Sequence, residues 1–254
     1  MRGSAFANNP NDLDGRAVQR AYRFWAPVYD VAWRPVLSQA HKAAALAARD
    51  VGGRILEIGV GTGLTFDHYR GAEVEIYGID RCEEMLAKAR QKVESGRYPE
   101  VRDLQNMDAH DLRFPDGFFD CVLAQFVITL VAKPEVVLSE CARVLRPGGE
   151  LILASHFYSE RGIIAGVERL SAAPLRALGL RPEFPFGRLV RWAESDGRAE
   201  LVESRKIGFT GHTLVRFRRL AVGDAAEQPA PAAYADGAPA LGVAPQLGKE
   251  PQQP

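Results

Sequence analysis

The sequence predicts an α/β protein with a doubly wound, mostly parallel sheet and helices on both faces. Short β-branched runs alternate with helical patterns between about residues 52 and 220, and a glycine-rich loop follows the first run at Gly59. Two late runs, Leu201–Phe209 and Leu214–Leu220, are separated by a tight turn around Gly211. Strands joined by so short a turn must be antiparallel.

Charge and cysteine usage narrow the class of protein. The 254 residues carry 32 Lys and Arg against 32 Asp and Glu, which argues against nucleic-acid binding through bulk positive charge. Cys82, Cys121 and Cys141 form no CxxC pair, which excludes a disulfide framework and predicts a reducing cytoplasm and no metal site. The segment Met1–Pro10 lacks the apolar core of a signal peptide, and the longest apolar stretch, Cys121–Ala132, is far shorter than the ~20 residues that span a bilayer.

Composition divides the chain into three regions. Residues 1–50 are rich in Ala, Arg and aromatic residues at helical spacing, and we expect them to form an N-terminal helical cap that contacts a membrane. Residues 51–221 are expected to form the α/β domain. Residues 222–254 hold mainly Ala, Pro, Gly and Gln, which predicts a disordered tail because such a segment cannot offset the entropy lost on ordering.

The elements of the α/β domain are predicted in order along the chain. Strands are expected over Arg54–Ile58, Glu75–Ile79, Arg102–Asn106, Asp120–Val127 and Glu150–His156. Helices are expected over Glu83–Val93 and from Pro134 to Leu145, before Pro147 and two glycines. Ligands of such sheets bind beyond the carboxyl ends of the strands, so a functional site is expected there.

The loop after the first strand reads Glu-Ile-Gly-Val-Gly-Thr-Gly over residues 57–63. Glycines at these positions let the backbone turn sharply and approach a ligand closely, although a simple turn is the alternative. A dinucleotide-binding loop would need a glycine where Leu64 stands. The carboxylate of Glu57 suits an ammonium better than a pyrophosphate. An NAD-dependent oxidoreductase is therefore disfavoured.

Two further carboxylates fall at predicted strand ends. Asp80 ends the second strand, where a carboxylate can accept two hydrogen bonds from a ribose diol. Asp108, followed by Ala109, comes after the third strand and can accept from an adenine amino group. Taken alone, Asp80 could equally cap the helix at Glu83, and Asp108 could serve in a turn. Together with Glu57 they predict a positively charged adenosine cofactor, and S-adenosylmethionine fits.

Five short motifs between residues 54 and 157 carry a family resemblance. They are Glu-Ile-Gly-Val-Gly-Thr-Gly at 57–63, Gly-Ile-Asp at 78–80 with Glu-Met-Leu at 84–86, Met-Asp-Ala at 107–109, Phe-Pro-Asp at 114–116 and Arg-Val-Leu-Arg-Pro-Gly-Gly at 143–149. This set resembles class I S-adenosylmethionine-dependent methyltransferases. The resemblance implies a Rossmann-like, seven-stranded sheet with its last strand antiparallel. We expect the cofactor site to comprise Glu57, Gly59, Gly61, Gly63, Asp80, Arg81, Met85, Asp108, Ala109 and Gln125.

Segments outside these motifs bear on the methyl acceptor. Residues 22–30, 155–157, 168–170 and 181–185 together resemble bacterial phosphatidylethanolamine N-methyltransferases, although Gln125 stands where those enzymes are expected to have tyrosine. This resemblance implies methylation of the headgroup amine of phosphatidylethanolamine, or of its mono- and dimethyl forms, towards phosphatidylcholine. Quinone methyltransferases share the Tyr-Asp element near the N-terminus, so a quinone precursor or small molecule is an alternative acceptor. A further alternative function is that of a non-catalytic protein that binds a nucleoside.

Two segments suit an anionic membrane surface. Apolar residues recur at helical spacing from Val18 to Tyr29 with arginines beside them, as in interfacial helices, although Pro27 should interrupt the helix and a lid on the sheet is the alternative. Residues 161–191 carry six arginines against two acids, and each basic residue contributes about 1 kcal/mol near such a surface. A solvated helix face is the alternative. The expected location is cytoplasmic and peripheral to the membrane.

Catalysis is expected to depend mainly on positioning, because the cofactor already carries its leaving group. The acceptor amine must be neutral to attack, and desolvation beside a sulfonium lowers its pKa. We assign Tyr22 and Tyr29 to catalysis and Trp25 and Phe126 to substrate binding, since aromatic faces can hold a methylammonium by about 0.5–2 kcal/mol each. His156 is a further catalytic candidate that would contact phosphate or relay a proton, with a buried structural role as the alternative.

Overall fold

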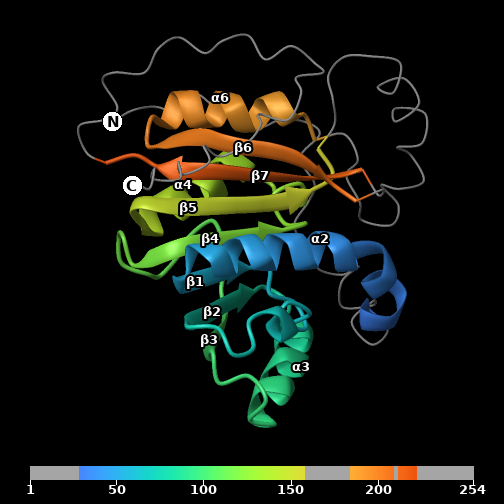
Figure 1. Cartoon of the computed structure of the whole chain (residues 1–254). Coiled ribbons are helices and arrows are strands. Elements are labelled where there is room, and N and C mark those ends of the chain that lie inside the picture. Colours follow the sequence, from blue (N-terminus) through green and yellow to red (C-terminus); the bar gives the residue numbers. More distant parts are fainter. Residues whose placement is uncertain (1–28, 158–183, 209–210, 222–254) are drawn as a thin grey trace, which may run out of the picture.

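The computed structural model describes residues 29–157, 184–208 and 211–221, which form a sheet with helices on both faces (Figure 1). Within these residues the sheet has seven strands in the order β3-β2-β1-β4-β5-β7-β6. In this described sheet β7 runs opposite to the other six strands, so it pairs antiparallel with both β5 and β6. The predicted fold class is confirmed. The strands are β1 Gly53–Ile58, β2 Val74–Asp80, β3 Val101–Asn106, β4 Phe119–Gln125, β5 Leu145–Ser155, β6 Ala199–Ile207 and β7 His212–Arg219.

The described helices pack against the two faces of the sheet. They are α2 Tyr29–Val51, α3 Glu83–Glu94, α4 Pro134–Val144 and α6 Phe186–Asp196, with a short 3-10 helix, η1, at Phe66–His68. Helix α2 lies across β4 and β5, α3 lies along β2 and β3, and α6 lies beside β6 (Figure 1). Helix α4 packs on the face opposite to α2, as the two separate buried clusters show.

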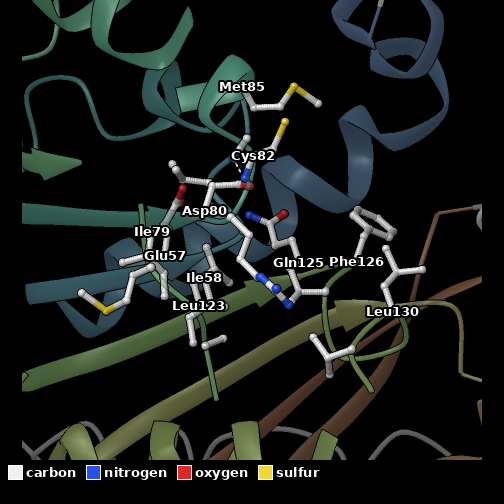
Figure 2. A pocket seen from close by; sticks show the side chains of 18 of the residues that line it. Glu57, Ile58, Ile79, Asp80, Cys82, Met85, Leu123, Gln125, Phe126 and Leu130 are labelled. Carbon is white, nitrogen blue, oxygen red and sulfur yellow. Dashed lines mark hydrogen bonds between the residues drawn. The ribbon is translucent and has the colours of Figure 1, made fainter. Parts of the chain in front are cut away.

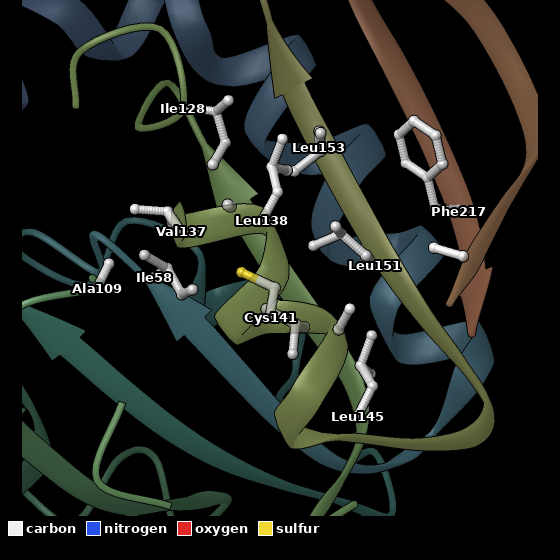
Figure 3. Close-up of a cluster of buried hydrophobic side chains, with 14 of the residues drawn as sticks. Ile58, Ala109, Ile128, Val137, Leu138, Cys141, Leu145, Leu151, Leu153 and Phe217 are labelled. Carbon is white, nitrogen blue, oxygen red and sulfur yellow. The ribbon is translucent and has the colours of Figure 1, made fainter. Parts of the chain in front are cut away.

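Alternation along the strands divides the core between the two faces. In β4, Cys121 and Leu123 belong to the cluster under α2, whereas Val122 and Ala124 belong to the cluster under α4. The α2 side is built on alanines, which let the helix lie close to the sheet: Ala40, Ala44, Ala45, Ala47 and Ala48. The α4 side holds larger side chains, among them Val137, Leu138, Cys141, Leu151, Leu153 and Phe217 (Figure 3).

Two predicted boundaries need correction. The helix predicted to run to Leu145 ends at Val144, because Leu145 is extended at φ −72°, ψ 142° and pairs with Phe119 as the first residue of β5. The strand predicted to run to Val127 ends at Gln125, because Phe126 takes the left-handed φ of 56°. The Pro-Gly-Gly segment after Leu145 lies inside β5, where the register with β4 shifts.

Helix α6, which the sequence analysis did not predict, is fixed to α4 by a buried ion pair. Arg188 lies against Glu135, with one contact at 2.9 Å from Nη2 to Oε2, and their side chains are 13% and 8% exposed. Arg188 is one of the six arginines expected to face a membrane. Its guanidinium instead pairs with Glu135 in the interior of the protein, and it also lies over the ring of Phe184.

Several predictions fall outside the described residues. They concern the segment before Tyr29, most of the basic segment 161–191, and the tail beyond residue 221. None of the described helices is long and apolar enough to cross a bilayer.

Candidate functional site

A pocket opens beyond the carboxyl ends of β1, β2 and β4, where the sequence analysis placed the site (Figure 2). Apolar side chains of the strand ends and of α3 form much of its wall, including Ile58, Ile79, Met85, Met107 and Leu123. The structure brings together at this pocket ten residues singled out from the sequence: Glu57, Gly59, Gly61, Asp80, Arg81, Met85, Asp108, Ala109, Gln125 and Phe126.

The glycine loop has backbone angles that residues with a side chain rarely adopt. Gly59 and Gly61 have φ of 70° and 56°, and a Cβ on Gly59 would lie 2.2 Å from Cγ2 of Val127. A Cβ on Gly61 would meet nothing within 4 Å, so this backbone borders open space in the pocket. Gly63 is not at the pocket wall. A Cβ there would collide with the ring of Phe66, which gives Gly63 a packing role.

Asp80 ties this loop to the start of α3. Its carboxylate accepts hydrogen bonds from the backbone N–H of Gly61 at 2.9 Å and of Cys82 at 2.8 Å. The helix begins after Cys82, so Asp80 is not its N-cap. Burial raises the pKa of Asp80, although the two backbone N–H groups act in the opposite direction. The carboxylate oxygens retain further lone pairs for a ligand.

Glu57 is almost fully buried below the loop. Its carboxylate accepts hydrogen bonds from the hydroxyls of Tyr69 at 2.5 Å and Thr65 at 2.7 Å. Burial raises the pKa of Glu57 to about 6, and the two hydroxyls oppose that rise. Neither Tyr69 nor Thr65 was predicted as a partner, because both follow the loop in segments without a regular pattern.

Asp108 lies at the rim of the pocket and is organised as a turn. It accepts from the backbone N–H of His110 at 3.0 Å and contacts Nδ1 of that ring at 2.6 Å, and Arg81 lies 3.5 Å away. Burial acts to raise the pKa of Asp108, but His110 and Arg81 outweigh it and lower that pKa. The turn role considered from the sequence is therefore present together with a position in the pocket.

The part of the pocket beside α2 differs, because its polar groups carry no charge. We call His41, Gln125 and Phe126 the α2-side wall. Gln125 is buried, and its Oε1 has no hydrogen-bond partner among the described residues; neither ring nitrogen of His41 has one. Burial lowers the pKa of His41 to about 4; the Gln125 side chain lies close enough to the ring to oppose this shift, although the two groups do not meet with normal hydrogen-bond geometry. The Phe126 ring lies edge-on to His41 at 5.4 Å and to His212 at 5.1 Å.

The remaining predicted site residues either lie away from the pocket or fall outside the part of the chain that the structure describes. Tyr22 and Trp25 precede the residues that the structure describes. Tyr29 is the first residue of α2, but the structure does not describe its side chain. His156 lies beside Gly211 and is not among the residues that line the pocket. His41 was missed, because nothing in the helical pattern of residues 29–51 indicates which turn of the helix reaches the strand ends.

The pocket fits the predicted cofactor. A positively charged adenosine derivative needs carboxylates for its hydroxyl and ammonium groups, apolar walls for its purine, and a backbone that leaves room at the loop. Asp80, Glu57 and Asp108 provide the carboxylates, and the strand-end side chains provide the apolar walls. The backbone at Gly61 leaves the room that is needed at the loop.

Comparison with known proteins agrees with this geometry. A family model described as a methyltransferase domain matches residues 56–153. A solved S-adenosylmethionine-dependent methyltransferase from Aquifex aeolicus superposes with a TM-score of 0.58 at 17% identity, covering 82% of this chain and 100% of that one. At this identity the superposition shows the fold alone.

Sequence relatives extend the match beyond the domain. The chain is 41% identical over 204 residues to a phosphatidylethanolamine N-methyltransferase from Cereibacter sphaeroides, covering 80% of this chain and 98% of that protein. It therefore belongs to the class I S-adenosylmethionine-dependent methyltransferases, and S-adenosylmethionine is its cofactor. It is 40% identical over 126 residues to a demethylmenaquinone methyltransferase from Thermus thermophilus, of which it covers 54%.

Proposed function

We propose that this methyltransferase acts on the headgroup amine of phosphatidylethanolamine, and on its mono- and dimethyl forms, at a membrane surface. The extent of the likeness to the lipid enzyme supports the proposal most strongly. That likeness spans 80% of the chain, whereas the likeness to the quinone enzyme spans 49%. Because acceptors are selected outside the shared domain, the longer match favours the lipid amine.

The chain's own residues position the reactants. Asp80, Glu57 and Asp108 would hold the cofactor through its hydroxyl and amino groups, and the apolar wall would exclude water. When bound, S-adenosylmethionine would supply an electrophilic methyl group and keep the electron pair of the broken S–C bond, while the amine lone pair would form the N–C bond. After the first and second transfers the product ammonium would release a proton to solvent, whereas the third transfer would give a quaternary ammonium that has no proton to release. Correct positioning of two reactants contributes about 7–11 kcal/mol to such a step. The Phe126 ring face would hold a methylated ammonium.

The uncharged α2-side wall also suits an amine acceptor. Carbon methylation of a quinone ring needs a base beside the ring, and His156, the base nominated from the sequence, is not among the residues that line the pocket. Two histidines do line the pocket. His41, with a pKa of about 4, is a weak base, and His110 is held by the Asp108 carboxylate at 2.6 Å. A neutral amine carries its own lone pair and needs no base for the attack.

A labelled-methyl assay tests the acceptor directly. Purified protein is incubated with methyl-labelled S-adenosylmethionine and either phosphatidylethanolamine vesicles or a demethylated quinone, and the products are separated by chromatography. The proposal predicts label in mono- and dimethylated lipid. Label only in the quinone would overturn it, and binding of the cofactor without release of S-adenosylhomocysteine on either acceptor would indicate a non-catalytic binding protein.

Membrane association is the second part of the proposal. Co-sedimentation with anionic liposomes is compared between the full chain and a chain that lacks residues 1–25. Loss of binding in the shortened chain supports the N-terminal segment as the membrane contact. Undiminished binding would move the contact to residues 161–191, and a full chain that does not sediment with liposomes would contradict the membrane proposal.

A further inference from the structure

Two buried polar side chains of the α2-side wall, His41 and Gln125, lie close to each other, and neither has a hydrogen-bond partner of normal geometry among the described residues. The amide oxygen of Gln125 comes from the end of β4, and His41 comes from α2, which crosses that strand. Figure 2 shows the Gln125 side chain reaching into the pocket from the strand end, with Phe126 beside it. Buried polar groups in native proteins are normally hydrogen-bonded, and those that are not often face a ligand.

The backbone at Phe126 is unusual at the same place. Its φ of 56° makes it the one non-glycine residue with positive φ among the described residues. Such conformations cluster at functional sites, where the surroundings hold them in place. Here the Phe126 ring makes edge contacts with the rings of both His41 and His212. The strained backbone and the two unpartnered groups thus lie together in one wall.

The chemistry of this wall defines what it can bind. A neutral imidazole has one ring nitrogen that accepts a hydrogen bond, and an amide oxygen accepts as well. With its pKa at about 4, His41 is neutral near pH 7. The wall therefore offers two uncharged acceptors to a group that carries N–H hydrogens.

We infer that His41 and Gln125 receive the N–H hydrogens of the acceptor amine and thereby make the enzyme favour the least methylated lipid. This inference rests on the proposed function. A neutral primary amine has two N–H hydrogens for the two acceptors, and its lone pair then points away from them. Each methyl transfer replaces one N–H by a methyl group, so the secondary amine leaves one acceptor unused and the tertiary amine leaves both unused. The pair acts as a specificity-determining site for successive methylation steps.

The test measures kcat/KM separately on vesicles of phosphatidylethanolamine and of its N-monomethyl and N,N-dimethyl forms. Gln125→Leu and His41→Phe remove one acceptor each while retaining apolar bulk. Each should lower the ratio of kcat/KM for the unmethylated lipid to that for the dimethylated lipid by about tenfold, the effect of one net hydrogen bond. His41→Gln keeps an acceptor, so it should lower this ratio less than His41→Phe does. The comparison remains informative if one of the apolar substitutions disturbs folding.

Gln105→Leu is the matched control, because Gln105 lies on β3 and does not line the pocket. This control should leave the ratio unchanged. Titration calorimetry with S-adenosylhomocysteine separates the inference from the earlier expectation that Gln125 binds the cofactor: its affinity should change less than twofold in Gln125→Leu. An equal loss on all three lipids, or a loss explained by weaker cofactor binding, would overturn the inference. A wild-type protein that methylates none of the three lipids would instead refute the proposed function, and the inference with it.

Discussion

The backbone N–H of Gly61 donates a 2.9 Å hydrogen bond to the carboxylate of Asp80, so the acidic residue at the end of β2 fixes the glycine loop that follows β1. The same carboxylate accepts from Cys82 at the start of α3. Asp80 therefore lines the pocket and also links three segments that border it. A change at Asp80 should affect cofactor binding and local stability together.

Replacing Asp80 by alanine is expected to weaken S-adenosylmethionine binding at least tenfold. The change removes the carboxylate that we propose accepts from the ribose hydroxyls. It also leaves the Gly61 and Cys82 N–H groups without their partner, which costs about 1–2 kcal/mol of folding stability. Calorimetry measures the first effect and urea denaturation the second. Asp80→Asn, which retains one acceptor oxygen, should lose less stability than Asp80→Ala. Unchanged affinity in the folded Asp80→Ala protein would remove Asp80 from the cofactor site.

Two glycines form a matched pair for testing the loop. Gly61 and Gly71 both have positive φ, 56° and 71°, and a Cβ on either would meet no atom within 4 Å. Alanine at either position should therefore cost a similar amount of stability, about 1–2 kcal/mol, from backbone strain. Only Gly61 lines the pocket, so only Gly61→Ala should weaken binding of S-adenosylhomocysteine in calorimetry. Equal affinities for both variants would contradict the placement of the loop.

Glu57 gives the fold a pH dependence with a definite sign. Its pKa rises from 4.5 to about 6 on folding because the carboxyl is buried, so the folded state holds the proton more tightly than the unfolded state. The resulting stability is fully present below pH 4.5 and is lost as the pH rises through about 6. From well below pH 4.5 to well above pH 6 the wild type should lose on the order of 2 kcal/mol relative to Glu57→Gln, as measured by urea denaturation without cofactor. A difference between the two proteins that stays constant with pH would contradict the burial of an ionisable Glu57.

The buried pair of Arg188 and Glu135 should matter for stability more than an exposed pair. Arg188→Ala leaves the Glu135 carboxylate buried without its cation, which typically costs about 3–5 kcal/mol. Arg102→Ala breaks the exposed pair with Glu75 and should cost less than about 1 kcal/mol. Chemical denaturation of the two variants gives the comparison. Similar small losses for both would show that α6 is not fixed to α4 through Arg188.

The sequence predicted the sheet and the grouping of Glu57 and Asp80 at one pocket, because both depend on local patterns. Strand periodicity locates β1, β2 and β4, and parallel strands bring their carboxyl ends to one edge, so Glu57 and Asp80 converge without further information. Boundaries were less accurate, because they depend on single residues. The left-handed backbone of Phe126 ends β4 early, and no residue preference marks a phenylalanine for that conformation.

The α2-side wall could not be predicted in the same way. His41 reaches the pocket only because the alanine face of α2 lies flat on the sheet, which is a tertiary relationship. The expected membrane role of Arg188 failed for a similar reason: the sequence shows its charge, whereas its partner Glu135 lies 53 positions away. Local patterns locate charges and turns, but they do not show which side chains become buried together.

The most direct test of the whole account is a crystal structure of the protein with S-adenosylhomocysteine. The account predicts ribose hydroxyls within hydrogen-bonding distance of Asp80, the adenine amino group near Asp108, and the sulfur directed towards Gln125 and Phe126, whose α2-side wall stays free for the acceptor. A ligand whose ribose lies away from Asp80, or whose adenine fills the space between His41 and Gln125, would contradict it.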